Sequence, residues 1–429
     1  MSAKFINTLP EIIKNQIISE DTALRIERYF ESKEAEAPNK LFVLFGILGS
    51  LLIGSGIILL FAHNWDYLPK MIKTVLAFIP LIIGQLLVGF SIFKKKSQTW
   101  KEASGVFLFF GVGAAIALIG QIYNVPGNLE GYLLTWIALC LPLVYLLKSK
   151  VLAILHLVFA TYYACLVGYF GNGQIPWLYL VVLVGLLPFY YNIIKNEAAS
   201  NGFSLLNWLF PLSLTITFGS FLDVSSSRLY LVFILFFGLL YNIGQLPYLK
   251  ILKLRKNGYL AIGSLGVVVT LLLASFHRYW SGDFNYEYYS ASSFYVPIFL
   301  ITLTVVTLVY SHIKDSLKPF NLFGYVFALY LIVFIVSSYY ATAGLVLINF
   351  LILGLGITTV KTGVDKYHFG ILNYGLLIIT ALISFRFFDT NMSFVIRGLL
   401  FIAIGVGFFS ANYFMLKKQR SNQNKSLNN

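Results

Sequence analysis

Charged residues are scarce in this sequence. They make up 11 % of its 429 residues, whereas a soluble globular chain carries about 25 %. Only two cysteines are present, Cys140 and Cys165, and both lie within apolar runs, so neither a disulfide framework nor a cysteine-based metal site is indicated. No HExxH, CxxC, GxSxG or P-loop pattern occurs. We therefore predict no metal, no cofactor and no catalytic residue.

Apolar residues, by contrast, are abundant: 58 % of the chain is hydrophobic and 17 % is aromatic. A helix of about 20 apolar residues crosses the ~30 Å hydrocarbon layer of a membrane. We predict an all-α polytopic integral membrane protein with about 14 transmembrane helices. The expected spans are residues 41–62, 70–93, 104–123, 129–147, 151–170, 176–194, 203–221, 229–247, 258–276, 294–311, 320–338, 341–359, 369–386 and 394–415.

Lysine and arginine are unevenly distributed between the expected spans. Alternate connections and the C-terminal tail carry 19 of them, from Lys94 to Lys425, whereas the opposite connections carry four. Cytoplasmic loops of membrane proteins hold the positive excess, so both termini are expected in the cytoplasm. The net charge of +14 is therefore interpreted as a topology signal, and no nucleic-acid partner is expected.

The two ends of the chain differ in kind from its middle. Residues 1–40 are predicted to form a soluble cytosolic helical hairpin, because Ser19 is typical of an N-cap and charges alternate after it. Such a hairpin is too small to hold a core alone, so it packs either on the membrane domain or on a sister subunit or cytosolic partner. Residues 41–416 form the transmembrane domain, and residues 417–429 a disordered basic tail.

Polar residues gather at the outer ends of the first and third expected spans. If these spans are neighbours, their side chains form one polar cup able to hold a lipid headgroup or a sugar; the alternative is simple helix termination at the membrane surface. The cup residues are His63, Asn64, Trp65, Asp66, Gln121, Tyr123 and Asn124. Deeper in the membrane, Gln85 and Asn349 either join helices or line a substrate path.

The middle of every expected span lacks Asp, Glu, Lys and Arg. Ion-coupled transport usually depends on a buried carboxylate, so this absence disfavours an energised antiporter. Near the surface, Arg386 and Arg397 flank Asp389 and are candidate phosphate contacts, or they extend to lipid headgroups. An outer-face enzyme such as a glycosyltransferase would need the acids of the outer loops, among them Asp66 and Asp283; we consider this the less favoured alternative.

Three stretches resemble a known family. These are LPEIIKNQIISEDTALRIERYF at residues 9–30, GSGIILLFAHNWDYLP at 54–69, and GVGAAIALIGQIYNVPG at 111–127, followed by Trp136 and Pro142. They are similar to predicted bacterial inner-membrane proteins catalogued as domain of unknown function 2157. The resemblance extends over roughly residues 8–147, and the stretch 393–418 is similar to the last span of the same proteins. It implies a fold class and a bacterial inner-membrane location, but no activity.

The sequence thus leads to two main functional hypotheses. The first is binding or translocation of a lipid or a lipid-linked polar molecule, motivated by neutral polar and aromatic groups at the helix ends. The second is a non-transporting membrane scaffold or sensor that signals through residues 1–40. Membrane lipids are the expected partners in either case; the substrate, the direction of transport and the oligomeric state do not follow from the sequence.

Overall fold

The computed structural model describes residues 9–35, 65–171, 174–198, 200–222, 226–281, 292–314, 321–389 and 393–427. All regular elements in these ranges are helical, which confirms the predicted fold class. The chain divides into two units, Met1–Leu76 and Ala77–Asn429. The predicted first span, 41–62, lies outside the described residues.

The N-terminal unit contains two short helices, α2 (Leu9–Lys14) and α3 (Glu20–Ala35), where a helical hairpin was predicted. Ser19 precedes α3 as expected of an N-cap, and its Oγ accepts a hydrogen bond from the Thr22 backbone N–H at 3.3 Å. The same unit holds the turn η1 (Trp65–Tyr67) and the first residues of α5 (Lys70–Phe93).

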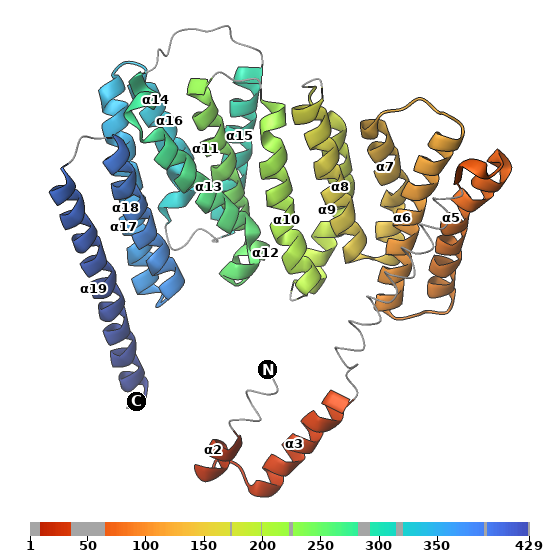
Figure 1. The fold of residues 1–429 in the computed structure, drawn as a ribbon. Helices are drawn as coiled ribbons and strands as arrows, with labels where there is room; N and C mark the ends of the chain where they lie inside the picture. Colours follow the sequence, from red (N-terminus) through yellow and green to blue (C-terminus); the bar gives the residue numbers. More distant parts are fainter. Residues whose placement is uncertain are drawn as a thin grey trace. The chain divides into compact units, whose positions relative to one another are not determined.

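The second unit continues α5 and contains the remaining helices in sequence order (Figure 1). They are α6 (Gln98–Ile122), α7 (Leu129–Leu147), α8 (Lys150–Cys165) with the π-helical turn η2 (Leu166–Phe170), α9 (Trp177–Glu197), α10 (Asn201–Phe218), η3 (Gly219–Phe221), α11 (Ser226–Gly244), α12 (Pro247–Lys250), η4 (Leu254–Lys256), α13 (Gly258–Ala274), α14 (His277–Ser281), α15 (Ser292–Ile313), η5 (Leu322–Tyr325), α16 (Val326–Ser337), α17 (Ala341–Asp365), α18 (Phe369–Asp389) and α19 (Phe394–Leu427).

Ten of the described helices are long and apolar enough to span a membrane, and three more apolar helices are shorter: Leu229–Gly244, Gly258–Ala274 and Leu322–Ser337. The chain is therefore a multi-pass membrane protein. These helices coincide with the predicted spans from 70–93 onward. The total of fourteen spans stays a prediction, because among the described residues ten helices are long enough to cross a membrane.

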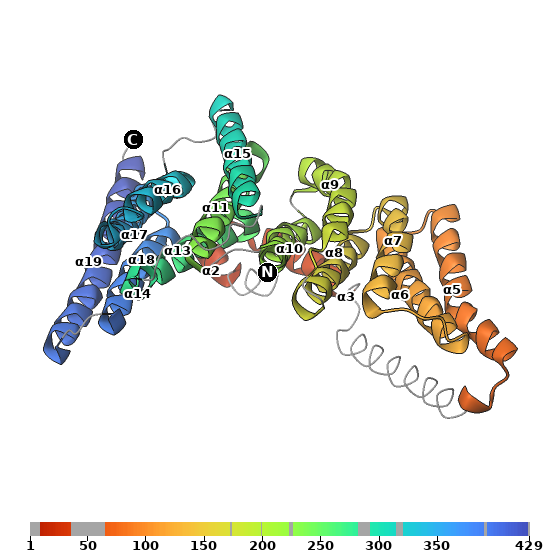
Figure 2. The same ribbon diagram turned by 90° about the horizontal axis from the view of Figure 1, so that it is seen from above.

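Neighbouring helices in the second unit run antiparallel, so alternate connections lie at opposite ends (Figure 1). Figure 2 shows α5 to α10 side by side, followed by α11 to α19. The two groups meet mainly through α10 and α13, with further contacts of α10 with η4 and of α9 with α12. Within the second group, α11 packs on α13, α15 and α16. Small residues permit close approach: a Cβ added to Gly263 of α13 would lie 2.4 Å from the backbone nitrogen of Tyr241 in α11.

Candidate functional site

An open groove with a volume of about 780 Å³ lies on one face of α6. Known ligand pockets have volumes of roughly 300–1,000 Å³. Two rows of residues at i, i+4 spacing form its floor, and Pro80 of α5 and Val151 of α8 form its sides. The rows are Thr99, Ala103, Phe107 and Gly111, and Glu102, Val106, Phe110 and Ala114.

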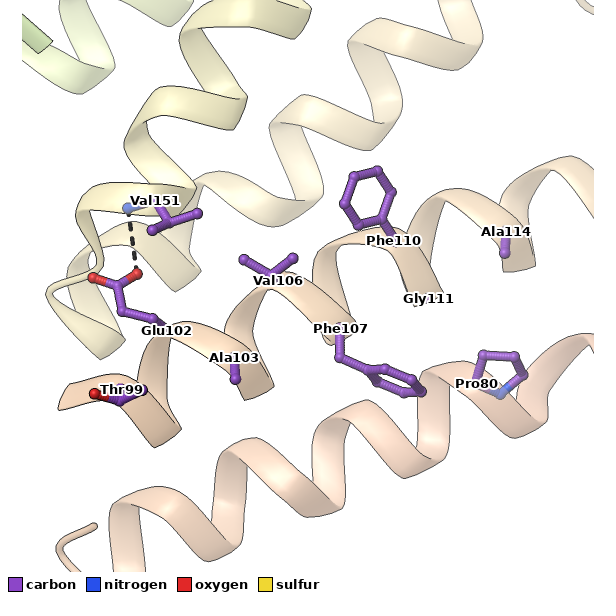
Figure 3. A pocket seen from close by; sticks show the side chains of 10 residues that line it. All are labelled: Pro80, Thr99, Glu102, Ala103, Val106, Phe107, Phe110, Gly111, Ala114 and Val151. Carbon is purple, nitrogen blue, oxygen red and sulfur yellow. Dashed lines mark hydrogen bonds between the residues drawn. The ribbon is translucent and has the colours of Figure 1, made fainter. Parts of the chain in front are cut away.

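The walls of the groove are almost entirely apolar. Figure 3 shows Phe107 extending between α6 and α5 toward Pro80, whereas Phe110 extends from the opposite side of the groove floor. Both phenylalanines are exposed at the protein surface, at 43 % and 46 %. Gly111 lets the helices approach, because a Cβ there would lie 3.0 Å from the Pro80 carbonyl oxygen. The groove is thus an open, apolar surface formed mainly by two helices long enough to span a membrane.

Among the described residues that line this groove, Glu102 is the only carboxylate, and it lies at one end (Figure 3). Its carboxylate accepts hydrogen bonds from the Lys150 N–H at 3.0 Å, the Val151 N–H at 3.3 Å and the Ser149 hydroxyl. These donors form the N-terminus of α8, whose free N–H groups and dipole favour a negative charge. Glu102 therefore caps α8 from a different helix.

Gln98, one turn earlier on α6, caps the C-terminal end of α7. Its Nε2 donates to the carbonyl oxygens of Leu147 and Lys148, at 3.3 and 3.2 Å. Carbonyl groups in the last turn of a helix lack intrahelical donors. Together the two side chains fix the α7–α8 turn against the start of α6.

The interior behind the groove is aromatic. Phe109, Trp136 and Phe159 lie in contact, with ring centroids 4.6 to 5.3 Å apart. The indole Nε1 of Trp136 donates to the Phe109 carbonyl oxygen at 2.7 Å. Gly113 leaves the space for this ring, since a Cβ there would lie 2.4 Å from it. This cluster supports the helix face that carries the groove.

The groove, the capping residues Gln98 and Glu102, and Trp136 all lie in the first third of the chain. This part of the sequence matches one protein family. Residues 11–153 match the family described as a predicted membrane protein (DUF2157). The match confirms the family resemblance over this part of the sequence. No match to a curated protein or to a solved structure was found. The match therefore supports a membrane location for the DUF2157 region and assigns no function to it.

The residues of the predicted polar cup are divided between the two units of the chain, and each unit is described by itself. His63 and Asn64 lie outside the described residues. In the N-terminal unit, Trp65 lies under the Lys73 ammonium, 5.6 Å from the ring centroid, and Asp66 is exposed. The joint cup therefore stays a prediction.

The other half of the cup lies at the end of α6 in the DUF2157 region. Gln121, Tyr123 and Asn124 are all exposed there. Asn124 adopts a left-handed conformation, with φ of 51°, and the Val125 N–H donates to the Gly120 carbonyl oxygen at 2.9 Å. This is the hydrogen-bonding pattern of a helix end. The three residues thus terminate α6 and present polar groups at its surface.

The two predicted intramembrane amides differ in environment. Gln85 is exposed on α5. Asn349 of α17 is half-buried and donates from Nδ2 to the Leu345 carbonyl oxygen at 2.7 Å, while its Oδ1 is buried without a hydrogen-bond partner. Both roles considered for them, helix association and a substrate path, stay predictions.

The predicted arginine pair lies outside the DUF2157 region. Arg386 forms an ion pair with Asp389 at 2.7 Å and also donates to Ser275 at the end of α13. Asp389 in turn accepts the His277 N–H at 3.1 Å. Arg397 lies over the ring of Phe394, 5.4 Å from its centroid. Arg386 thus joins α18 to the α13–α14 connection, and the phosphate contact stays a prediction.

Sequence reasoning missed two buried asparagines that lie inside apolar helices. Asn207 of α10 is inaccessible and accepts a hydrogen bond from the Tyr190 hydroxyl at 2.6 Å. Asn242 of α11 is 2 % exposed. The available signal was an amide inside an apolar run, the same signal that singled out Asn349.

Proposed function

We propose that the protein binds an anionic membrane lipid along α6, with an acyl chain in the groove. The observation that supports this most directly is an open, largely apolar cavity of about 780 Å³ on helices long and apolar enough to span a membrane. In a membrane, the acyl chains of the surrounding lipids fill any groove between membrane-spanning helices. A particular lipid is preferred only if polar or charged groups lie where its headgroup would be.

Such groups lie next to the groove in the α5–α6 connection. Lys94, Lys95 and Lys96 follow α5 directly, and Lys101 stands beside the groove residue Glu102. Each lysine near an anionic lipid surface contributes about 1 kcal/mol of attraction. The basic cluster therefore favours a phosphate-bearing headgroup at this end, while the carboxylate of Glu102 is engaged by α8.

Translocation extends the same proposal, because α6 joins two polar ends. One end lies beside the basic connection, and the other carries Gln121, Tyr123 and Asn124. A headgroup moving along the outside of this helix would exchange lysines for neutral amides while its chain stays in the apolar groove. The proposed setting is the bacterial inner membrane, with the lysine-rich connections and both termini in the cytoplasm.

Lipid binding is tested by filling the groove. Ala103 lines the groove and is exposed, so Ala103→Trp places an indole in it with little effect on the interior. Leu139→Trp is the matched control, because Leu139 is 60 % exposed on α7 and does not line the groove. The assay is native mass spectrometry of each variant titrated with phosphatidylglycerol and, separately, with phosphatidylcholine.

We expect one tightly retained phosphatidylglycerol, weakened at least about tenfold by Ala103→Trp and unchanged by Leu139→Trp. Replacing Lys94, Lys95 and Lys96 together by Gln should remove the preference over phosphatidylcholine, by about 100-fold at 1 kcal/mol per lysine. Equal retention by all variants, or no preference between the two lipids, would refute the proposal.

The second hypothesis, a scaffold or sensor that uses residues 1–40, has its own support. The N-terminal unit is a separate compact body, and α3 with its preceding turn exposes Leu24 and Ile17 at 49 % and 71 %. Exposed apolar side chains on a small hairpin favour a protein partner. Deleting residues 1–35 should abolish co-purification of that partner while lipid retention persists; loss of both would contradict the separation of roles.

A further inference from the structure

The connection between α11 and α13 presents apolar side chains at the protein surface. Tyr248, Ile251 and Leu254 recur at every third residue from α12 into η4, and all three are exposed, Ile251 at 85 %. Two exposed cations, Lys253 and Arg255, lie among them in the sequence. These five residues are called the α12 patch below. A surface that combines bulky apolar groups with positive charge is typical of a binding surface.

The fold holds this connection in a fixed conformation. Asn257, which is 2 % exposed, donates from Nδ2 to the carbonyl oxygens of Gly244 and Leu249, at 2.8 and 3.1 Å. From α10, the Trp208 indole Nε1 donates to the Arg255 carbonyl oxygen at 3.0 Å. Because side chains of the protein bind the backbone from both sides, the outward direction of the apolar residues is part of the fold.

The charge of the α12 patch is not compensated by the neighbouring sequence. Residues 224–282 contain no Asp and no Glu. Within the described part of the chain, neither Lys253 nor Arg255 forms an ion pair. A partner that matches this surface therefore has to carry negative charge.

The length of α13 indicates that this partner is a lipid. Helix α13 starts at the connection and has 17 residues, so it is about 25 Å long. The hydrocarbon layer is ~30 Å thick, and a tilt of the helix would increase the shortfall of roughly 5 Å. Exposed apolar side chains just before its start supply the missing apolar length.

We propose that the α12 patch is an interface with anionic phospholipids. Tyr248, Ile251 and Leu254 enter the edge of the hydrocarbon layer, where tyrosine is enriched in membrane proteins. Lys253 and Arg255 bind the phosphate groups above it, and their aliphatic stems cover the same apolar surface. This interface is separate from the groove on α6 and does not depend on the lipid proposed there.

The first test measures the depth of the α12 patch in a membrane. A nitroxide spin label is attached to Ile251→Cys in the full-length protein in nanodiscs. Half-buried Cys165 is replaced by Ala, whereas Cys140 is inaccessible and stays in place. The control is Asn196→Cys, because Asn196 is an exposed polar residue near the end of α9, which contacts α12.

Electron paramagnetic resonance then compares collisions of each label with oxygen, which dissolves in lipid, and with a water-soluble nickel complex. We expect the label at 251 to favour oxygen and the label at 196 to favour nickel. If the label at 251 is as accessible to nickel as the label at 196, the α12 patch lies in water. The proposal is then overturned, and an acidic protein becomes the better partner.

The second test measures the charge preference of the α12 patch. Ile251→Trp is reconstituted with brominated phosphatidylglycerol or brominated phosphatidylcholine, and quenching is taken as the difference from the protein without this tryptophan. We expect stronger quenching by phosphatidylglycerol. Lys253→Gln and Arg255→Gln should each lower this preference about fivefold, the equivalent of about 1 kcal/mol per cation near an anionic surface.

The matched control for the charge is Lys361→Gln, which changes an exposed lysine of α17 outside the α12 patch. It should leave the lipid preference unchanged. No preference for phosphatidylglycerol, or equal effects of Lys361→Gln and Lys253→Gln, would overturn the proposal. The groove variant Ala103→Trp should behave normally in both tests, so that failure of the α6 groove and failure of the α12 patch can be told apart.

Discussion

Glu102 offers a direct test of how the first helices of the second unit are held together. Its carboxylate accepts three hydrogen bonds from the start of α8, two of them from backbone N–H groups at 3.0 and 3.3 Å. A hydrogen bond to a charged group contributes about 1.5–3 kcal/mol, and a carboxylate at a helix N-terminus about 0.3–1 kcal/mol. The Ser149 hydroxyl still caps the Leu152 N–H at 3.0 Å without Glu102, so these values are upper bounds.

We therefore expect Glu102→Gln, which keeps an acceptor but removes the charge, to cost about 1 kcal/mol of unfolding free energy. Glu102→Ala should cost about 2 kcal/mol, because it removes every acceptor. The matched control is Glu197→Gln. Glu197 of α9 forms an ion pair with Lys150 at the start of α8, but the side chain of Glu197 is 54 % exposed. Exposed pairs contribute about 0–1 kcal/mol.

The assay is equilibrium unfolding of the purified protein in mixed micelles, followed by tryptophan fluorescence. A double-mutant cycle with Ser149→Ala should give a coupling energy of about 0.5–1 kcal/mol, since the two side chains share a hydrogen bond. If Glu102→Ala changes stability no more than Glu197→Gln does, Glu102 does not cap α8 in the membrane and the assignment is wrong.

Two further predictions follow from the second unit. Gly263→Ala places a Cβ 2.4 Å from a backbone nitrogen of α11 and should cost about 1–3 kcal/mol in the same assay, whereas Gly405→Ala, with no atom within 4 Å, should be neutral. Asp389→Asn removes the negative charge from a pair whose side chains are only 17 % and 11 % exposed, and should cost about 2 kcal/mol or more.

The positions of the helices could be predicted from the sequence because a membrane leaves few alternatives. Backbone groups in hydrocarbon must be paired within the segment, so a long uncharged run such as 104–123 is helical. The predicted boundaries at α7, residues 129–147, agree with the structure at both ends. There Asn128 accepts the Gly131 N–H, as a helix N-cap does.

The site residues were less predictable because their partners are distant in the sequence. Glu102 precedes its expected span at 104–123, where a carboxylate is typical of a solvated helix end; only the fold brings it to residues 149–151. The Arg386–Asp389 pair likewise reaches Ser275, 111 residues away. Asn242 lies in an expected span, but the fold decides that its Nδ2 donates to the carbonyl oxygens of Gly238 and Gly324, and that its Oδ1 is left without a hydrogen-bond partner. Spacing along the chain contains none of this information.

The two side chains of α6 that cap α7 and α8 also limit how these helices can move. Since Gln98 binds the last carbonyls of α7 and Glu102 the first N–H groups of α8, the three helices can tilt only together, as one rigid body. Any rearrangement in this half then has to bend elsewhere. The π-helical turn Leu166–Phe170, where the α-helical hydrogen-bond register of α8 gives way, is the natural hinge for that movement.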